Sequence, residues 1–289
     1  MPRAQQQDRL LDGSEAERAE KHFLQSILHA SGGALIFSLP TLLTMEMWQL
    51  GFHMDPLRLA LFTALVVPLL IGLAYYAGFE ENFNWVDIVL DAFVAYAIGF
   101  VISAASLLLM AIIEPGQSAD EIVGKIAVQA VPGSIGAMLA NVLLGGDDRN
   151  EQQKRRWISY KGNIFLAAVG ALIVAFSLSS TEEMVLVAHK MTEWHAIALA
   201  TASLLIVGGF VYAVESPGRG QRPQGSAAPV LGVQLRYGVV GYVVALLISA
   251  YILWTFGRAD GTSAEEFLMA VIVLGFPASA GAGASRLIL

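Results

Sequence analysis

Long apolar segments alternate with short polar ones along the chain from residue 26 onward. A helix needs about 20 largely apolar residues to cross the hydrocarbon core of a bilayer. We therefore predict an all-α polytopic membrane protein with about eight transmembrane helices, at 26–50, 57–78, 86–113, 122–144, 162–180, 194–215, 229–256 and 267–288. After the fifth, the polar run Ser179 to Glu183 predicts that the span ends and a short surface helix follows.

Composition supports this class of protein. Of the 289 residues, 56% are hydrophobic and 14% charged, against about a quarter charged in soluble domains. The absence of cysteine excludes disulfides, thiolate metal sites and cysteine nucleophiles, and the net charge of −7 argues against nucleic acid as a partner. Residues 1–22 lack an apolar core, so we expect a polar cytoplasmic tail rather than a cleaved signal peptide.

The distribution of Lys and Arg predicts the orientation. Twelve of these residues fall at the termini and in the loops after spans two, four and six, and four lie near the opposite side. Both termini are therefore expected in the cytoplasm. All five tryptophans fall at predicted span ends, as an aromatic belt requires.

Two internal matches predict a duplication. The stretch VPGSIGA at 131–137 recurs as FPASAGA at 276–282, within 27 positions that share nine identities at an offset of 145. The tetrapeptide Gly-Ala-Leu-Ile at 33–36 recurs 137 positions later, so eight extra residues are expected in the segment 216–229. We predict two four-helix repeats, parallel because each has an even number of spans. They would cover 23–147 and 160–289, joined by a basic cytoplasmic linker at 148–159.

The repeated prolines interrupt the last span of each repeat. Proline kinks a helix and frees a carbonyl group, and symmetric Pro/Gly interruptions are a sequence pointer to a midplane binding site in transporters. The kinked segments would then line a pathway, with Pro132, Ser134, Gly136, Pro277, Ser279 and Gly281 as candidates. The alternative is that these small residues only allow close helix packing.

Charged residues supply further candidates. Asp87 and Asp91 lie one turn apart at the start of span three, and the repeat aligns Asp91 with Arg236. They could form a structural ion pair or handle protons and ions. Glu46 and Glu183, which match across the repeat, would lie at the outer mouth as cation ligands or as solvated carboxylates. Ser118 with Glu121, and Ser263 with Glu266, fit capping boxes at an acidic outer face.

Other chemistry is not indicated. The five histidines form no i, i+4 pair, and no catalytic triad, HExxH or Walker motif occurs. The motif Leu144-Gly145-Gly146-Asp147, which resembles the GxGD motif of intramembrane proteases, lies in a polar loop outside the predicted span. We therefore expect no enzymatic activity, no metal site and no cofactor.

The segments GFEENFNWVDIVLDA, VPGSIGA and GAGASRLIL resemble a bacterial family of integral membrane proteins of unknown function. The resemblance covers the membrane part of the chain, and it implies location and topology but no catalytic residue. From the residues themselves we predict a transporter or channel for a small cation, with proton coupling and assembly into a homo-oligomer left open. The contrasting hypothesis is a non-transporting membrane scaffold or sensor subunit, whose axis would be dry and fully packed.

Overall fold

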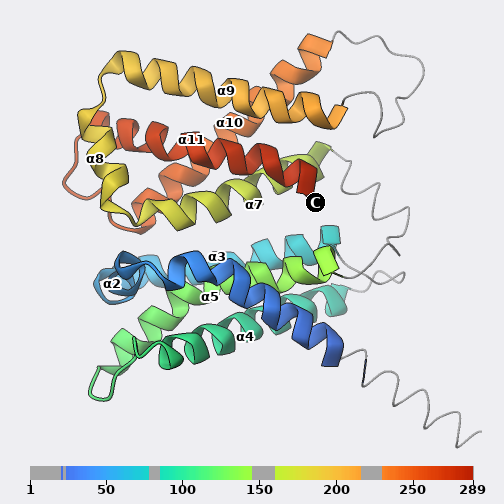
Figure 1. Ribbon diagram of the computed structural model, residues 1–289, viewed down its shortest axis with the longest axis vertical. Coiled ribbons are helices and arrows are strands. Elements are labelled where there is room, and N and C mark those ends of the chain that lie inside the picture. Colours follow the sequence, from blue (N-terminus) through green and yellow to red (C-terminus); the bar gives the residue numbers. More distant parts are fainter. Residues whose placement is uncertain (1–20, 22–23, 78–84, 145–159, 216–229, 289) are drawn as a thin grey trace, which may run out of the picture.

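The computed structural model describes residues 21, 24–77, 85–144, 160–215 and 230–288. All regular secondary structure in these ranges is helical, and the long helices lie roughly side by side in two groups (Figure 1). Seven described helices are long and apolar enough to cross a membrane, and a bent pair at the start would make eight. The prediction of an all-α, multi-pass membrane protein is confirmed. The predicted linker 148–159 and almost all of the predicted tail 1–22 lie outside the described residues.

Each group contains four long helices and one short one. The first group consists of a first helix at Leu24–Leu42, α2 at Met45–His53, α3 at Pro56–Ala77, α4 at Trp85–Leu109 and α5 at Ala119–Leu144. The second group consists of α7 at Tyr160–Ser179, α8 at Glu182–Lys190, α9 at Glu193–Glu215, α10 at Val230–Thr255 and α11 at Ala264–Ile288.

The first span is shorter than the sequence predicts. It ends at Leu42, and α2 continues at 89° to it after a break at Thr44, whose backbone is extended. Hydropathy could not locate this break, because the apolar residues continue through the turn. The short helix predicted after the fifth span is confirmed as α8, where Ser180 and Thr181 mark the break with polar side chains.

Both breaks expose backbone carbonyl groups that need donors, since an unpaired polar group in a bilayer costs several kcal/mol. The indole N–H of Trp48 donates to the Leu42 carbonyl at 2.8 Å. The Arg258 guanidinium donates to the Ser180 carbonyl at 2.6 Å. Side chains from nearby turns and helices therefore stabilise the sharp change of direction at each break.

Four pairs of corresponding helices in the two groups begin at corresponding residues. Helices α8 and α9 begin 137 positions after α2 and α3, and α10 and α11 begin 145 positions after α4 and α5. The turns that follow α4 and α10 also agree. Ala111 and Gly257, 146 positions apart, both have positive φ, of 55° and 74°. A duplicated four-helix unit, as the sequence predicts, would produce such equivalent positions.

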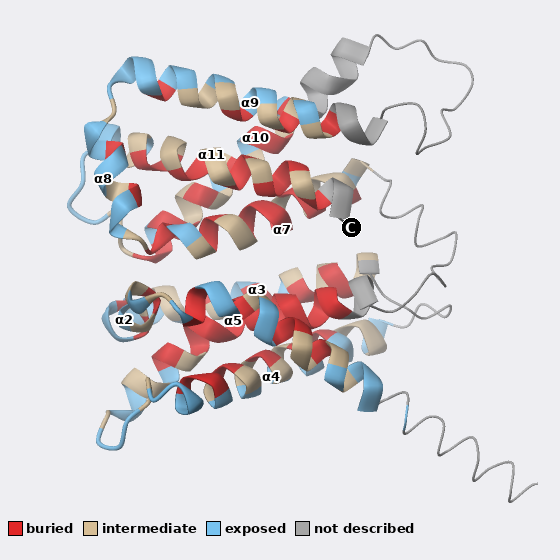
Figure 2. Cartoon of the chain, in the orientation of Figure 1, coloured by how far each residue is buried: buried red, intermediate tan, exposed pale blue. Residues whose placement is uncertain are grey.

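Helix α5 forms the centre of the first group. It packs against the first helix, α2, α3 and α4, and every residue from 127 to 140 is buried (Figure 2). In its most apolar stretch 83% of the residues are buried, against 44% for α11 in the second group. The difference arises because α5 also faces the second group, whereas the corresponding side of α11 is only partly covered.

Candidate functional site

The repeated prolines lie inside α5 and α11, with the serines that follow them bonded to their own helices. Ser134 Oγ donates to the Val131 carbonyl at 2.9 Å, and Ser279 Oγ donates to the Phe276 carbonyl at 2.7 Å. Both serines are fully buried. Both helices continue through the proline, and each carries an intrahelical side-chain hydrogen bond at the same position after it.

The repeated glycines lie at close helix crossings. A Cβ atom on Gly136 would overlap the backbone of Gly33 in the first helix, and one on Gly281 would overlap the backbone of Gly170 in α7. Only glycine allows two helix backbones to approach so closely. The motif thus joins each proline-containing helix to the first helix of its own group.

Two further described serines, at positions 146 residues apart in the two groups, are buried without a hydrogen-bond partner. Among the described residues, the hydroxyl groups of Ser103 in α4 and Ser249 in α10 are fully buried and unpaired. A Cβ on Gly133 would lie 3.4 Å from Ser103 Oγ, so this hydroxyl is directly beside Pro132. The sequence analysis missed both. The sequence feature that could have identified them is the tripeptide Ile-Ser-Ala, which occurs at 102–104 and again at 248–250.

A polar pair also lies close to the proline of α5. Thr41 Oγ1 donates to Gln129 Oε1 at 2.7 Å, and Gln129 Nε2 donates to the Thr41 carbonyl at 3.0 Å. Both residues are fully buried. The corresponding residue of α11 is the buried Leu274, so the second group lacks this pair. A lone glutamine in an apolar span was the available sequence signal.

The charged candidates lie on several helices of both groups. Asp87 is half-buried and Asp91 exposed on α4, which packs against α3 and α5. Arg236 belongs to α10, but its side chain lies outside the described residues. Glu46 is half-buried in α2, and Glu183 is exposed in α8. The two glutamates occupy equivalent places in different groups, each in the first turn of a short helix.

The predicted capping boxes are present at the starts of α5 and α11. The Glu121 and Glu266 amides donate to the hydroxyls of Ser118 and Ser263, each at 3.2 Å. Only Glu266 completes the box, by accepting from the Ser263 amide at 2.9 Å. The Glu121 carboxylate instead accepts from Lys125 Nζ at 2.6 Å. This acidic face therefore contains one internal ion pair in its first half.

A pocket of about 280 Å³ lies at this face, between α8 and the start of α11. His189 Nε2 and Glu266 Oε1 lie 3.9 Å apart at its wall. Within the described ranges, no three His, Asp or Glu side chains gather closely enough to hold a metal ion. The pocket lies at the end of the molecule that contains α8 (Figure 1), and neither Pro132 nor Pro277 lines it.

An ion pair joins the two groups at the same face. The Arg58 guanidinium at the start of α3 donates to both Asp260 carboxylate oxygens at 2.8 Å and to the Trp254 carbonyl at 3.0 Å. It also lies 5.0 Å from the centre of the Trp254 ring. The sequence analysis used Arg58 only to assign orientation, because its partner is about 200 positions away in the chain.

This ion pair predicts an acid dependence. The hydrogen bond from Arg58 lowers the pKa of Asp260 below its ordinary value of 3.8. A carboxylate with a lowered pKa stabilises the fold at neutral pH, and this contribution disappears as the pH falls through the lowered pKa. We expect Asp260→Asn to lower the thermal unfolding midpoint at pH 7 in detergent and to change it much less at pH 3. An equal decrease at both pH values would contradict the role of this ion pair.

Comparison with known families finds one match. A family model described as "Putative integral membrane protein (DUF2391)" matches residues 26–289. Neither the curated proteins nor the solved structures contain a significant match to the chain. The family description agrees with the multi-pass membrane architecture.

Proposed function

The chain belongs to the DUF2391 family of integral membrane proteins, and from that premise we propose that it is a transport protein, rather than an enzyme, that carries a small cation across the bilayer. The path would pass along the proline-containing helices α5 and α11. The membrane would be a bacterial inner membrane with both termini in the cytoplasm, as the distribution of Lys and Arg favours.

The proposal includes the duplication of a four-helix unit. Its support is that equivalent residues make equivalent contacts in the two groups. Gly33 crosses Gly136 and Ala140, and the residues 137 and 145 positions later, Gly170, Gly281 and Ser285, make the same crossing. Sequence identity alone could arise by chance between apolar helices. Matching three-dimensional contacts between the same aligned residues are much harder to obtain by chance.

The observation that carries the transport proposal is the pair of unpaired buried hydroxyls at Ser103 and Ser249. A buried polar group without a partner costs about 1–3 kcal/mol, so its presence at equivalent places in both halves requires an explanation. Pro132 and Pro277 also remove the donors that would bond the carbonyls of Val128 and Val273. Hydroxyl and carbonyl oxygens are the groups that coordinate small cations in membrane pathways.

The charged residues would act at the two ends of this path. Asp87, Asp91 and Arg236 would form a charge switch near the cytoplasmic side, because charged residues inside a membrane segment mark ion and proton paths. Glu46 and Glu183 would concentrate cations at the outer mouth.

A second candidate is a non-transporting scaffold or sensor subunit. The observation in its favour is the close packing of α5, which is buried throughout 127–140 and touches the first helix backbone to backbone. A packed axis of this kind needs no conducting path. The two candidates differ in whether the purified protein moves ions by itself.

Ion flux into proteoliposomes tests the proposal, with separate gradients of Na⁺, K⁺, Ca²⁺ and H⁺. For the transported ion, we expect the double variant Ser103→Ala/Ser249→Ala to reduce flux about tenfold, because a lost ligand worth about 1.4 kcal/mol gives that factor. Asp91→Asn should reduce it as well. The matched control is Ser177→Ala, whose hydroxyl is already bonded to the Ile173 carbonyl at 2.9 Å.

Each outcome assigns the function differently. Flux that the serine variant leaves unchanged would place the path elsewhere. Absence of flux for all four ions, from wild-type protein with a cooperative unfolding transition, would refute transport and support the scaffold candidate.

A further inference from the structure

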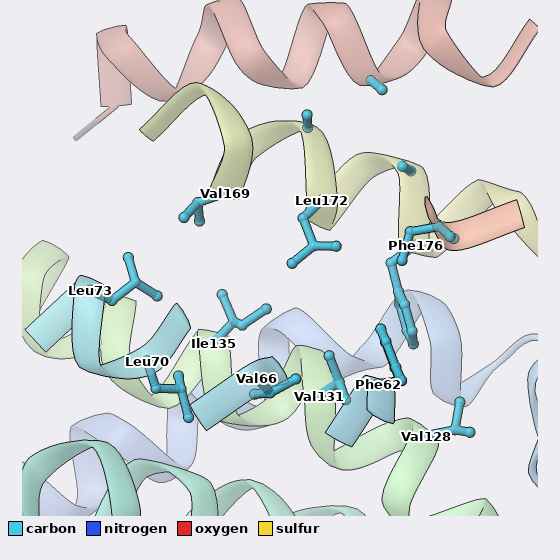
Figure 3. Close-up of a cluster of buried hydrophobic side chains, with 14 of the residues drawn as sticks. Phe62, Val66, Leu70, Leu73, Val128, Val131, Ile135, Val169, Leu172 and Phe176 are labelled. Atoms are coloured by element: carbon cyan, nitrogen blue, oxygen red, sulfur yellow. The ribbon is translucent and has the colours of Figure 1, made fainter. Parts of the chain in front are cut away.

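The two four-helix groups contact each other through different faces. The first group uses α3 and α5: Phe62, Leu73 and Ile135 point toward the second group (Figure 3). The same buried cluster contains Val66, Leu70, Val128 and Val131. The second group meets them with α7, through Val169, Leu172 and Phe176, and with α10. Duplicated units joined in this way form a heterologous contact, and one copy of each face is left unused.

One contact shows what the unused faces contain. A Cβ on Gly72 of α3 would meet the Phe165 ring of α7 at 2.7 Å, so this ring lies directly against Gly72. The residue 137 positions after Gly72 is also a glycine, Gly209, and nothing lies within 4 Å of its Cβ position. The residue 137 positions before Phe165 is Leu28, which is 70% exposed. The second group therefore has an uncovered glycine, Gly209, at the position equivalent to Gly72. The first group has an exposed apolar side chain, Leu28, at the position equivalent to Phe165.

The residues around Gly72 and Phe165 also have counterparts in the other group that are less buried. The three residues of α5 labelled in the buried cluster of Figure 3 correspond to Val273, Phe276 and Ala280 of α11, which are only partly buried. Three interface residues of α7 correspond to Gly32, Leu35 and Leu39 of the first helix. Leu35 is 42% and Leu39 38% exposed, whereas their counterparts Leu172 and Phe176 are 5% and 2% exposed. The unused faces thus keep the apolar character of the used ones.

The two residues of the ion pair between Arg58 and Asp260 also have counterparts in the other group. Arg58 corresponds to His195 at the start of α9, and Asp260 corresponds to Glu114 in the turn after α4. His195 and Glu114 are both exposed, and they belong to the two unused faces. A second contact built like the first would therefore place an imidazole beside a carboxylate where the first has an arginine beside an aspartate.

We propose that these two faces bind each other between copies of this chain, so that the protein forms a closed ring in the membrane. The Leu28 face, defined by Leu28, Leu35, Leu39 and Glu114, would dock on the Gly209 face of the next copy, defined by Gly209, Phe276, Ala280 and His195. The inference rests on the proposed duplication but not on transport. The smallest such ring is a dimer, which contains four repeated units.

A different pair of positions identifies the lipid-facing surface. Val101 of α4 and Leu247 of α10 are 146 positions apart and are each 65% exposed. Both repeats therefore leave this position uncovered, and it takes no part in the contact between them. In the proposed ring it faces lipid in every unit, so it supplies the control surface for the test.

Cysteine cross-linking in membranes tests the proposal, because the natural chain contains no cysteine. Leu28→Cys and Gly209→Cys chains, carrying different tags, are expressed together and treated with a short thiol-to-thiol reagent. We expect cross-links between the two tags and none in membranes that contain either variant alone. The pair Leu28→Cys and Leu247→Cys should give none. The chain carrying Gly72→Cys/Phe165→Cys should react within itself and report that the reagent reaches this depth.

A chain carrying both Leu28→Cys and Gly209→Cys should give a ladder whose largest species counts the copies in the ring. The proposal is overturned if the mixed Leu28/Gly209 pair does not cross-link while the Gly72/Phe165 control does. It is also overturned if either single variant cross-links to itself efficiently, since that requires a contact between identical faces. Neither result depends on ion flux, so failure of the ring and failure of transport remain distinguishable.

Discussion

Gly136→Ala and Gly33→Ala are expected to destabilise the protein by about 1–3 kcal/mol each, the usual effect of extra volume in a packed core. A methyl group at either position would overlap the backbone of the opposite helix, which cannot move aside as a flexible side chain would. The measurement is the free energy of unfolding from titration of mixed micelles with sodium dodecyl sulfate. Gly281→Ala should behave similarly, because its methyl group would overlap Gly170.

The matched control is Gly32→Ala, one position away in the same helix. Nothing lies within 4 Å of a Cβ on Gly32, and alanine in a helix is favoured over glycine by about 0.5–1 kcal/mol. The two neighbouring substitutions should therefore change stability in opposite directions. If Gly33→Ala were as stable as Gly32→Ala, the close crossing of the first helix and α5 would be wrong.

Phe62→Ala should reduce stability by about 3–5 kcal/mol, the range for removing a buried aromatic side chain. Phe62 is 2% exposed and lies at the centre of the contact between the two groups. Its ring stacks on Phe176 at 5.6 Å between centroids and meets Phe256 edge-on at 6.2 Å. Because the residue joins α3 to α7 and to the turn after α10, the cavity would loosen the two groups from each other. Thermal unfolding in detergent, followed by circular dichroism, measures the loss.

Leu61→Ala serves as the control for this substitution. Leu61 is the preceding residue of α3 and is 43% exposed, so much of its side chain contacts lipid or detergent instead of protein. Its truncation leaves no closed cavity, and we expect a decrease below about 1 kcal/mol, by the same cavity argument. Similar decreases for the two variants would contradict the assignment of Phe62 to the interface between the groups.

The local pattern of the sequence determined the helical class, the approximate spans and the short helix α8. It also determined the two serine caps, in which the Ser118 and Ser263 hydroxyls accept from the Glu121 and Glu266 amides within one helical turn. These features depend on neighbours in the chain. The equivalence of VPGSIGA and FPASAGA pointed to α5 and α11 as the helices of interest. It could not identify the glycines that they touch, because Gly33 and Gly170 lie in other helices.

Only the tertiary structure decided which apolar surfaces face protein. Hydropathy measures how strongly a segment prefers an apolar environment to water. Lipid and the protein interior are both apolar, so hydropathy does not distinguish between them. The sequence therefore could not predict that α5 is more buried than its counterpart α11, or that the first span breaks after Leu42. It also could not pair Arg58 with Asp260 or place Ser103 beside Pro132. The first of these contacts joins the two groups and the second joins neighbouring helices of one group. Both depend on helix rotation and on the relative placement of the groups, which packing sets.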